Sequence, residues 1–333
     1  MKAARIMTTL GYQGAHWDRL AQAVAPGHLD RVDCQDDAAV RNALRDAEIA
    51  FIAGDLDARY LEAPKLRWVH CDHAGLNKFA RPEIFAKGLI VTSSAGRSSP
   101  ALAEHAIFFM LALSYRFPLL YKAQQEHRWG IPQQDDLRGL YGQTIGIVGM
   151  GHIGQELAKR AKSFGMHVLG YRRSIAPAPE GVDKVYAAAA GDSIDPLLEQ
   201  SDFVVLAVPL SDRTHQLIGA SELRRMKRTA YIVNMARGAV IDEAALLAAL
   251  REGGIAGAGL DTFHTEPLPA DDPLWDAPNT LITPHFSPQV PDRTGRSLDI
   301  ICENLRRYRA GEAFLNQLTA DDVYTVAGRN RVA

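Results

Sequence analysis

Three polar residues in the last third of the chain combine side chains that bind anions and move protons. Arg237, Glu266 and His285 each follow a short apolar segment of strand-like composition. The carboxyl ends of parallel strands meet at one edge of an α/β sheet, so we expect these side chains to converge there. An imidazole exchanges protons near neutral pH, a carboxylate stabilises its charged form, and a guanidinium offers an anion a planar fork. The pattern indicates acid–base chemistry on a small anionic molecule.

A glycine-rich run lies between the apolar segment 144–148 and an amphipathic stretch. Its glycines have the spacing of a dinucleotide-binding turn. One glycine allows a positive φ, a second lets the pyrophosphate approach, and a third lets the helix pack closely. Amide groups at the start of the following helix then face the phosphates. The run predicts cofactor contacts at Gly149, Gly151, His152, Ile153 and Gly154.

Two arginines follow the next expected strand, 166–171. Arg172 stands about 20 residues beyond the glycine run, where the side chain that reads the ribose is expected. A carboxylate there would bind the ribose hydroxyls of NAD(H) and repel a 2′-phosphate, whereas a guanidinium would bind that phosphate. Arg172, together with Arg173 and Ser174, therefore favours NADP(H) over NAD(H). The alternative is that these residues form a solvated strand end.

The composition is that of a globular protein without marked affinity for polyanions. The 333 residues are 47% hydrophobic and 23% charged, with a formal net charge of −2. We therefore expect two domains and neither nucleic-acid nor membrane binding. Cys34, Cys71 and Cys302 are too few and too scattered for a disulfide framework or a zinc site, so no metal is expected. No signal-peptide pattern opens the chain, and no apolar run reaches the ~20 residues that span a bilayer, which predicts a cytoplasmic protein.

Strands and helices alternate along the chain in two successive series. Five apolar segments precede residue 100, and seven more follow between 144 and 283. This alternation predicts an α/β protein with two doubly wound parallel sheets, a flavodoxin-like substrate domain and a Rossmann cofactor domain, separated by a cleft. The helix expected after His285 has no strand after it, so we expect it to return to the first domain. The predicted domains are 1–100 with 287–333, and 101–286.

The ordered motifs resemble those of the D-isomer-specific 2-hydroxyacid dehydrogenase family. The chain has Gly-x-Gly-x-Ile-Gly from Gly149, Asn-x-x-Arg-Gly from Asn234, Asp-x-Phe-x-x-Glu-Pro from Asp261 and Thr-Pro-His from Thr283, in the family's order. By this resemblance Arg237 would bind the carboxylate and carbonyl of a 2-keto acid, His285 would be the acid/base, and Glu266 its partner. The resemblance also implies cofactor contacts at Val208, Pro209, Thr214, Ala236, Asp261 and Ser287, and substrate contacts at His73, Ala74 and Gly75 besides Arg237 and His285.

Arg172 is similar to the arginine of the glyoxylate/hydroxypyruvate reductase branch of that family. The resemblance implies NADPH-dependent reduction of small 2-keto acids to D-2-hydroxy acids by a homodimer, with His285 as proton donor. His73 stands where the family more often has a small residue, which leaves the size and polarity of the substrate open. One alternative is oxidation of a bulkier or phosphorylated 2-hydroxy acid. Another, from a different class, is a nucleotide-sensing corepressor that binds protein partners and would not require all three catalytic side chains.

Overall fold

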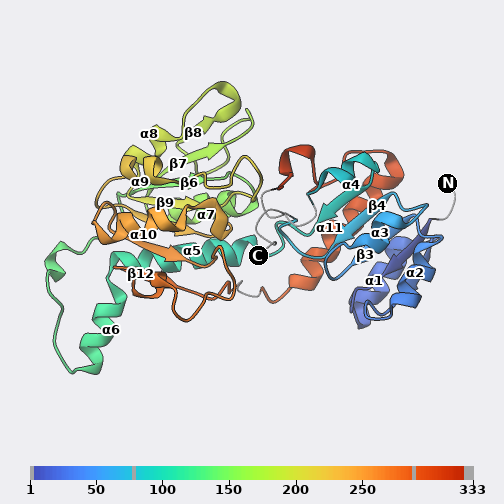
Figure 1. Cartoon of the computed structure of the whole chain (residues 1–333), viewed down its shortest axis with the longest axis horizontal. Helices are drawn as coiled ribbons and strands as arrows, with labels where there is room; N and C mark the ends of the chain where they lie inside the picture. Colours follow the sequence, from blue (N-terminus) through green and yellow to red (C-terminus); the bar gives the residue numbers. More distant parts are fainter. Residues whose placement is uncertain (1–3, 77–79, 287–289, 326–333) are drawn as a thin grey trace. The chain divides into compact units, whose positions relative to one another are not determined.

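The computed structural model describes residues 4–76, 80–286 and 290–325, and the chain divides into two compact units (Figure 1). Unit 1 comprises residues 1–97 and 290–333, and unit 2 comprises residues 98–289. These divisions lie a few residues from the boundaries expected from the sequence. Arg97 stays with unit 1 because its guanidinium bonds Asp72 and Ser297 there.

Unit 1 is built on a five-stranded parallel sheet with apolar clusters on its two faces. The strand order is β2-β1-β3-β4-β5, the flavodoxin-like arrangement. Leu298 and Ile301 of the last helix pack with Leu20 of the first helix over one face, so two distant segments share one core. The strands are β1 Arg5–Thr8, β2 His28–Arg31, β3 Ile49–Ile52, β4 Trp68–Cys71 and β5 Ile90–Ser93, and the helices are α1 Gly14–Val24, α2 Asp37–Leu44, α3 Ala58–Glu62, α4 Pro82–Ala86 and α11 Arg293–Ala310.

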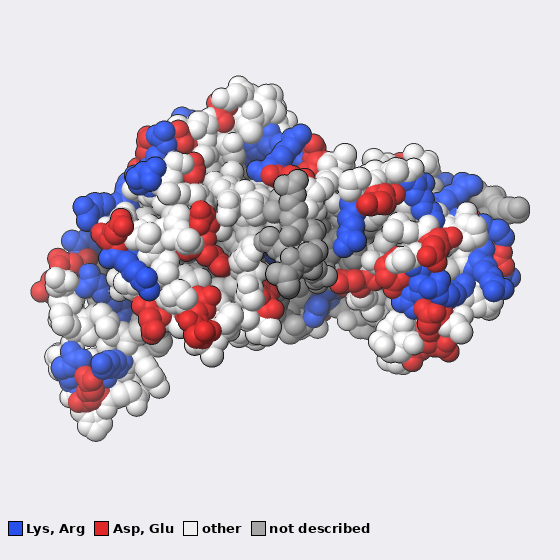
Figure 2. Space-filling model, viewed as in Figure 1, with Lys and Arg blue, Asp and Glu red and all other residues white. Residues whose placement is uncertain are grey.

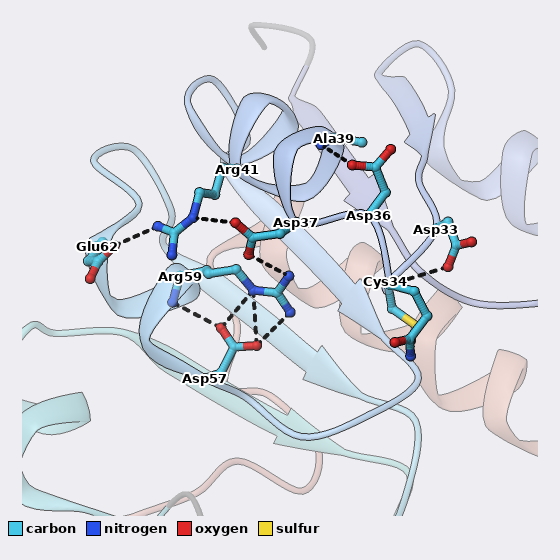
Figure 3. Close-up of polar contacts among 10 residues, drawn as sticks. Asp33, Cys34, Asp36, Asp37, Ala39, Arg41, Asp57, Arg59 and Glu62 are labelled. Atoms are coloured by element: carbon cyan, nitrogen blue, oxygen red, sulfur yellow. Dashed lines mark hydrogen bonds and ion pairs between the residues drawn. The ribbon is translucent and has the colours of Figure 1, made fainter.

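Aspartates determine where two helices of unit 1 begin (Figure 3). The side chain of Asp36 accepts a hydrogen bond from the Ala39 amide at the start of α2, and that of Asp57 accepts one from the Arg59 amide at the start of α3. Each carboxylate satisfies an amide that has no partner inside its helix and lies near the positive end of the helix dipole. The Arg59 guanidinium also bonds Asp37, which ties the two helix starts together.

Unit 2 contains a seven-stranded parallel sheet of Rossmann order, β12-β11-β10-β9-β6-β7-β8. The two parallel α/β sheets confirm the fold class predicted from the sequence. The strand order reverses around β6 and β9, and in such sheets the carboxyl ends of the strands form the ligand edge. The strands are β6 Thr144–Val148, β7 His167–Arg172, β8 Lys184–Ala187, β9 Phe203–Leu206, β10 Tyr231–Asn234, β11 Gly257–Leu260 and β12 Thr280–Ile282, and the helices are α5 Ser99–Ser114, α6 Phe117–Gln125, α7 His152–Ser163, α8 Asp195–Gln200, α9 Ala220–Arg225 and α10 Glu243–Arg251.

The long apolar helix α5 is buried within unit 2. It packs against α7, β10 and β11, and Gly259 of β11 makes this contact possible. A Cβ on Gly259 would lie 2.7 Å from the Phe109 ring, so only glycine lets the helix come this close. Across the described residues, no single helix is long and apolar enough to cross a membrane. Only α5 and α6 taken together, with a 64° bend between them, reach that length and composition.

Helix α6 and the segment after it extend away from the sheet of unit 2 (Figure 1). This arm, residues 117–138, exposes several large apolar side chains to solvent. Elsewhere on the face drawn in Figure 2, acidic and basic side chains are interspersed over both units. The exposed apolar side chains of the arm are Phe117, Leu119, Tyr121 and Trp129.

Candidate active site

A histidine and a glutamate form a close pair at the ends of two neighbouring strands. His285 follows β12 and Glu266 follows β11, and His285 Nδ1 lies 2.7 Å from Glu266 Oε2. The other carboxylate oxygen of Glu266 accepts the Phe263 amide of its own loop at 2.9 Å, which fixes the carboxylate before it meets the imidazole. Both side chains remain about one-third exposed, 38% for His285 and 34% for Glu266. Because Nδ1 is occupied, proton exchange with another molecule falls to Nε2.

The backbone at His285 is in the left-handed region, with φ of +50°. Residues other than glycine rarely adopt this conformation, and it persists only where the surroundings hold it. The His285 amide donates to the Thr283 carbonyl at 3.0 Å, which closes the turn after β12. The turn therefore presents the imidazole in one orientation.

Arg237 is positioned by the turn that follows β10. The Asn234 side chain accepts from the Ala236 amide and donates to the Arg237 carbonyl, both at 3.0 Å. The Arg237 guanidinium donates to the Ala236 carbonyl at 2.7 Å. Burial lowers the pKa of Arg237, and the nearby negative charge of Glu266 opposes that shift. The guanidinium is thus held by backbone and lies within the electrostatic reach of the Glu266 carboxylate.

The turns carrying Arg237 and Glu266 lie against each other. A Cβ on Gly238 would fall 1.9 Å from the carbonyl carbon of Phe263, so no larger residue fits between them. Glu243, at the start of α10, holds the same loop, because its carboxylate accepts the His264 amide at 2.7 Å. Burial raises the pKa of Glu243. The structure therefore brings the turns of Arg237, Glu266 and His285 to one edge of the sheet.

The glycine-rich turn has the shape required to bind a dinucleotide. Gly149 has φ of +107°, and a Cβ there would lie 2.4 Å from the Ala207 carbonyl oxygen. A Cβ on Gly154 would lie 2.0 Å from the Gly149 oxygen, so close packing requires both glycines. Gly151, in contrast, has no atom within 4 Å of its Cβ position and caps the start of α7, where His152 is exposed and Ile153 half-buried. The open backbone at Gly151 fits the approach of a pyrophosphate to a helix N-terminus.

Arg172 is the last residue of β7 and is held by the loop that follows. One terminal nitrogen of its guanidinium donates to the Pro177 carbonyl at 3.2 Å. Its Nε is buried and has no hydrogen-bond partner among the described residues. Arg173 and Ser174 are exposed beside it. A guanidinium with unfilled bonding capacity at this strand end is suited to bind an anion.

The remaining predicted cofactor residues lie in the same unit. Val208 and Pro209 follow β9, where the Thr214 hydroxyl donates to the Pro209 carbonyl at 2.6 Å and closes the turn. Ala236 is buried in the turn after β10. Asp261 is buried after β11, and its Oδ1 accepts from the Thr283 hydroxyl at 2.6 Å and the Phe286 amide at 2.9 Å. Ser287 lies outside the described residues.

The predicted substrate residues His73, Ala74 and Gly75 belong to unit 1, whereas Arg237 and His285 belong to unit 2. Gly75 has φ of +82°, which a side chain would strain. The His73 Nε2 lies 3.6 Å from the carboxylate of Asp55, and its Nδ1 lies 3.3 Å from the Ala74 carbonyl oxygen. No group of three or more His, Cys, Asp or Glu side chains within the described ranges could hold a metal ion.

Sequence reasoning missed four polar residues near these loops, of which three are buried and Asp72 is partly buried. His70, Asp72 and Arg97 form hydrogen bonds under the loop after β4, and His105 on α5 bonds Thr283. The one available signal was a polar residue inside an otherwise apolar segment, which His70 and His105 both provide.

The strand order and the glycine turn define unit 2 as a Rossmann domain of the dinucleotide-binding type. The family model described as "D-isomer specific 2-hydroxyacid dehydrogenase, NAD binding domain" matches residues 107–287. The chain is 39% identical over 274 residues to the glyoxylate reductase of Korarchaeum cryptofilum, covering 80% of each chain. It is 34% identical to the D-3-phosphoglycerate dehydrogenase of Methanocaldococcus jannaschii, covering 79% of this chain and 49% of that one.

A solved structure also resembles this chain over nearly its whole length. The D-isomer specific 2-hydroxyacid dehydrogenase of Xanthobacter autotrophicus Py2, in complex with NADPH and MES, has a TM-score of 0.79 and 29% identity, covering 96% of this chain and 98% of that one. The chain belongs to the D-isomer-specific 2-hydroxyacid dehydrogenase family, as the order of its motifs predicts. The family consists of oxidoreductases that act on 2-hydroxy acids.

Proposed function

We propose that this chain uses NADPH to reduce small 2-keto acids, of the glyoxylate and hydroxypyruvate type, to D-2-hydroxy acids. The observation that carries the proposal is the 2.7 Å bond between His285 and Glu266 at the strand edge of a dinucleotide-binding domain. The similarity to a glyoxylate reductase supports the substrate class. The NADPH of the Xanthobacter autotrophicus structure, together with Arg172, supports the cofactor.

Each of the three strand-end residues has a distinct role in this reaction. Arg237 binds the carboxylate and carbonyl of the keto acid with its planar fork. His285 gives a proton from Nε2 to the carbonyl oxygen as negative charge develops there, and Glu266 orients the ring and stabilises its charged form. When bound, the reduced nicotinamide supplies the hydride. The backbone around Ala74 and Gly75 supplies further hydrogen-bond donors to the substrate carboxylate, and His73 bears on the size and polarity of the substrate accepted.

The cofactor is held by residues of unit 2. Gly149, Gly151, His152, Ile153 and Gly154 bind the pyrophosphate, and Arg172, Arg173 and Ser174 bind the 2′-phosphate. The adenosine and pyrophosphate are lined by Val208, Pro209 and Thr214. The nicotinamide end is lined by Ala236, Asp261 and Ser287. The open backbone at Gly151 and the unfilled bonding capacity of Arg172 support the first two groups, and the resemblance to the family supports the others.

The cofactor proposal is tested by replacing Arg172. A charge-assisted contact to phosphate contributes about 1.5–3 kcal/mol, so Arg172→Ala should lower kcat/KM with NADPH by about 10- to 100-fold and leave that with NADH nearly unchanged. Arg224→Ala, which removes an exposed arginine from α9, is the matched control. Equal efficiency of the parent enzyme with NADPH and NADH would overturn the 2′-phosphate role.

The acid–base proposal is tested at the two strand-end residues. His285→Ala should lower kcat for glyoxylate by about 10²- to 10⁴-fold while the cofactor still binds. Glu266→Gln removes the anion beside the imidazole, so the alkaline limit of reduction should move to lower pH. An unchanged alkaline limit would show that Glu266 does not stabilise the charged imidazole. A parent protein that binds NADPH but turns over no keto acid would favour a nucleotide-sensing role.

A second substrate class is favoured by the similarity to a D-3-phosphoglycerate dehydrogenase. In that case the enzyme would oxidise a bulkier or phosphorylated 2-hydroxy acid. Rates with glyoxylate, hydroxypyruvate and a phosphorylated keto acid, measured in both directions, distinguish the two. A preference for the phosphorylated compound would replace the first proposal.

The exposed side chains of the arm support assembly as a homodimer. Phe117, Leu119, Tyr121 and Trp129 form a concentration of apolar surface that a monomer leaves in water. Light scattering should give a mass near twice the 36.4 kDa of one chain, and Trp129→Glu with Tyr121→Glu should shift it toward that of one chain. The three cysteines are unpaired, which suits a reducing compartment and supports a cytoplasmic enzyme.

A further inference from the structure

His105 lies on the buried face of α5, close to the turn that carries His285. It is 7% exposed, and its ring stacks on Phe109 with 4.8 Å between centroids and 20° between planes. A buried polar side chain is destabilising unless its polar atoms are bonded. The position of His105 in an apolar helix therefore points to a role for its side-chain bond, from Nε2 to the Thr283 hydroxyl at 3.2 Å.

The direction of each bond around Thr283 determines the protonation of His105. Asp261 Oδ1 accepts the Phe286 amide at 2.9 Å and also the Thr283 hydroxyl at 2.6 Å. A hydroxyl has a single proton, and Thr283 gives it to Asp261, so the imidazole must be the donor to Thr283. These bond directions place a proton on His105 Nε2, and burial lowers the pKa of the ring, which favours its neutral form. Its Nδ1 is buried and has no hydrogen-bond partner among the described residues.

This chain of bonds fastens the two loops that form the catalytic pair. Thr283 and Phe286 bracket His285, whose positive φ needs support from its surroundings. Asp261 begins the loop that carries Glu266. A single carboxylate oxygen thus holds both loops, and His105 holds the hydroxyl that orients this oxygen.

The second oxygen of Asp261 is left for another donor. Oδ1 already accepts two hydrogen bonds, while Oδ2 accepts none within the described residues. Burial raises the pKa of Asp261, and the hydrogen bonds that Oδ1 accepts act against that shift. An amide N–H donor of the kind found on a nicotinamide carboxamide would match this free oxygen.

We propose that His105 is a positioning residue, which acts through Thr283 to hold the Asp261 carboxylate and the His285 turn where a bound nicotinamide carboxamide can meet them. The inference about the carboxamide rests on the proposed function, because it requires a nicotinamide cofactor. The direction of the hydrogen bonds from His105 to Thr283 and from Thr283 to Asp261 does not depend on the proposed function.

The first experiment reads the bond direction without cofactor. Nitrogen-15 NMR of the histidine side chains in the cofactor-free protein, with the His105 signals assigned by their loss in His105→Gln, should show a protonated Nε2 and an unprotonated Nδ1. An unprotonated Nε2 would overturn this chain of bonds from His105 through Thr283 to Asp261. This result stands whether or not the protein uses a nicotinamide cofactor.

The second experiment measures binding rather than turnover. His105→Phe keeps an aromatic ring on Phe109 but removes the donor, and His105→Gln restores an N–H donor at a similar reach. Loss of one net hydrogen bond should weaken NADPH binding about fivefold in His105→Phe, with recovery in His105→Gln. Binding of 2′-phospho-ADP-ribose, which lacks the nicotinamide, should stay unchanged in both variants.

Thr283→Val provides an independent variant of similar shape. If the two residues act through one relay, the double variant with His105→Phe should bind NADPH no more weakly than either single variant. Phe109→Leu is the packing control, and it should lower the unfolding temperature while leaving the ratio of NADPH to fragment affinity unchanged. Equal losses for NADPH and fragment, or additive losses in the double variant, would assign His105 a purely structural role. Failure of the parent to bind any nicotinamide dinucleotide would overturn the proposed function and the carboxamide contact together, and the NMR result would still decide the bond direction.

Discussion

Two buried histidines, one in each unit, make the same directed chain of hydrogen bonds. In unit 1, His70 Nε2 lies 3.0 Å from the Ser94 hydroxyl, which donates to Asp72. In unit 2, His105 bonds Thr283, which donates to Asp261. In each case the hydroxyl has given its proton to the aspartate, so the ring donates from Nε2. Each chain ends at an aspartate that directly follows a strand of its sheet.

The two relays differ in what completes them. In unit 1, the Trp68 indole donates to the Thr92 hydroxyl, which bonds His70 Nδ1, so both ring nitrogens have partners. Asp72 is neutralised by the Arg97 guanidinium at 2.7 Å, and burial lowers the pKa of Arg97 while Asp72 opposes it. In unit 2, His105 Nδ1 has no partner among the described residues, and backbone and hydroxyl donors alone hold Asp261. We call the unit 1 network the closed relay, because both nitrogens of its histidine have partners and its aspartate has a counter-ion. We call the unit 2 network the open relay, because His105 Nδ1 and Asp261 Oδ2 have no hydrogen-bond partner among the described residues.

The two networks use the same kinds of groups, but only the unit 1 network has a partner for each of them. Buried polar networks stabilise a fold when every member is satisfied, and each unsatisfied member is costly. The closed relay ties Asp72, the first residue after β4, to Ser94 and Arg97. The open relay retains an unused acceptor, Asp261 Oδ2, beside the His285–Glu266 pair.

The largest expected effect comes from changing each aspartate to asparagine. Asp72→Asn leaves the buried Arg97 charge without its counter-ion and should lower the free energy of unfolding by about 3–5 kcal/mol. Asp261→Asn keeps the oxygen that accepts from Thr283 and Phe286, so we expect a loss of only about 1 kcal/mol. Urea unfolding at neutral pH compares the two.

The asparagine variants also control for each other, because the chemical change is the same. Asp261→Asn should weaken NADPH binding although it unfolds almost like the parent, since an amide nitrogen replaces the free acceptor. Similar destabilisation by the two variants would show that the closed and open relays are energetically alike.

The secondary-structure elements and the strand-end residues can be predicted from the sequence, whereas the two hydrogen-bond relays cannot. The turn from Gly149 to Gly154 and the polar residues after β10, β11 and β12 follow from local patterns, because a parallel sheet brings its strand ends to one edge. The relays depend on pairs that no local pattern connects. His105 and Thr283 are separated by 178 positions, and Arg97 and Ser297 by 200. Only the packing of α5 and α11 places them together.

The pH dependence of the free energy of unfolding should reveal the buried His70 ring of the closed relay. Burial lowers the pKa of His70 from 6.5 to about 4. Well above pH 6.5 the ring is neutral in both the folded and unfolded states, so it contributes no pH dependence there. As the pH falls, the unfolded state takes up a proton first, and the free energy of unfolding should drop by about 2 kcal/mol between pH 7 and pH 5 from this group alone.

His70→Gln removes the titrating ring and should flatten the stability profile over that interval. His16→Gln, which changes an exposed histidine on α1, is the matched control and should keep the slope of the parent. Denaturant unfolding at several pH values measures the stability profiles of both variants. A His70→Gln profile as steep as that of the parent would show that the ring is not held neutral by its surroundings.

The smallest effect is expected where charges pair on the surface of unit 1 (Figure 3). Arg41 bonds Asp37 and Glu62, both at 2.9 Å, yet these three side chains are 51%, 62% and 63% exposed. Water solvates the charges whether or not they are paired, so such bridges contribute little to stability. Glu62→Gln should shift the unfolding temperature by less than about 2 °C.

Glu62→Gln makes the same exchange of carboxylate for amide as Asp72→Asn, and each changed group faces one arginine. The bond lengths, 2.9 Å and 2.7 Å, are also similar. What differs is burial, since the Asp72 side chain is 15% exposed and that of Arg97 is 7%. Thermal unfolding of the two variants at low and high salt therefore isolates burial as the variable. If Glu62→Gln destabilised unit 1 as much as Asp72→Asn, burial could not be the reason for the strength of the closed relay, and its contrast with the open relay would need another cause.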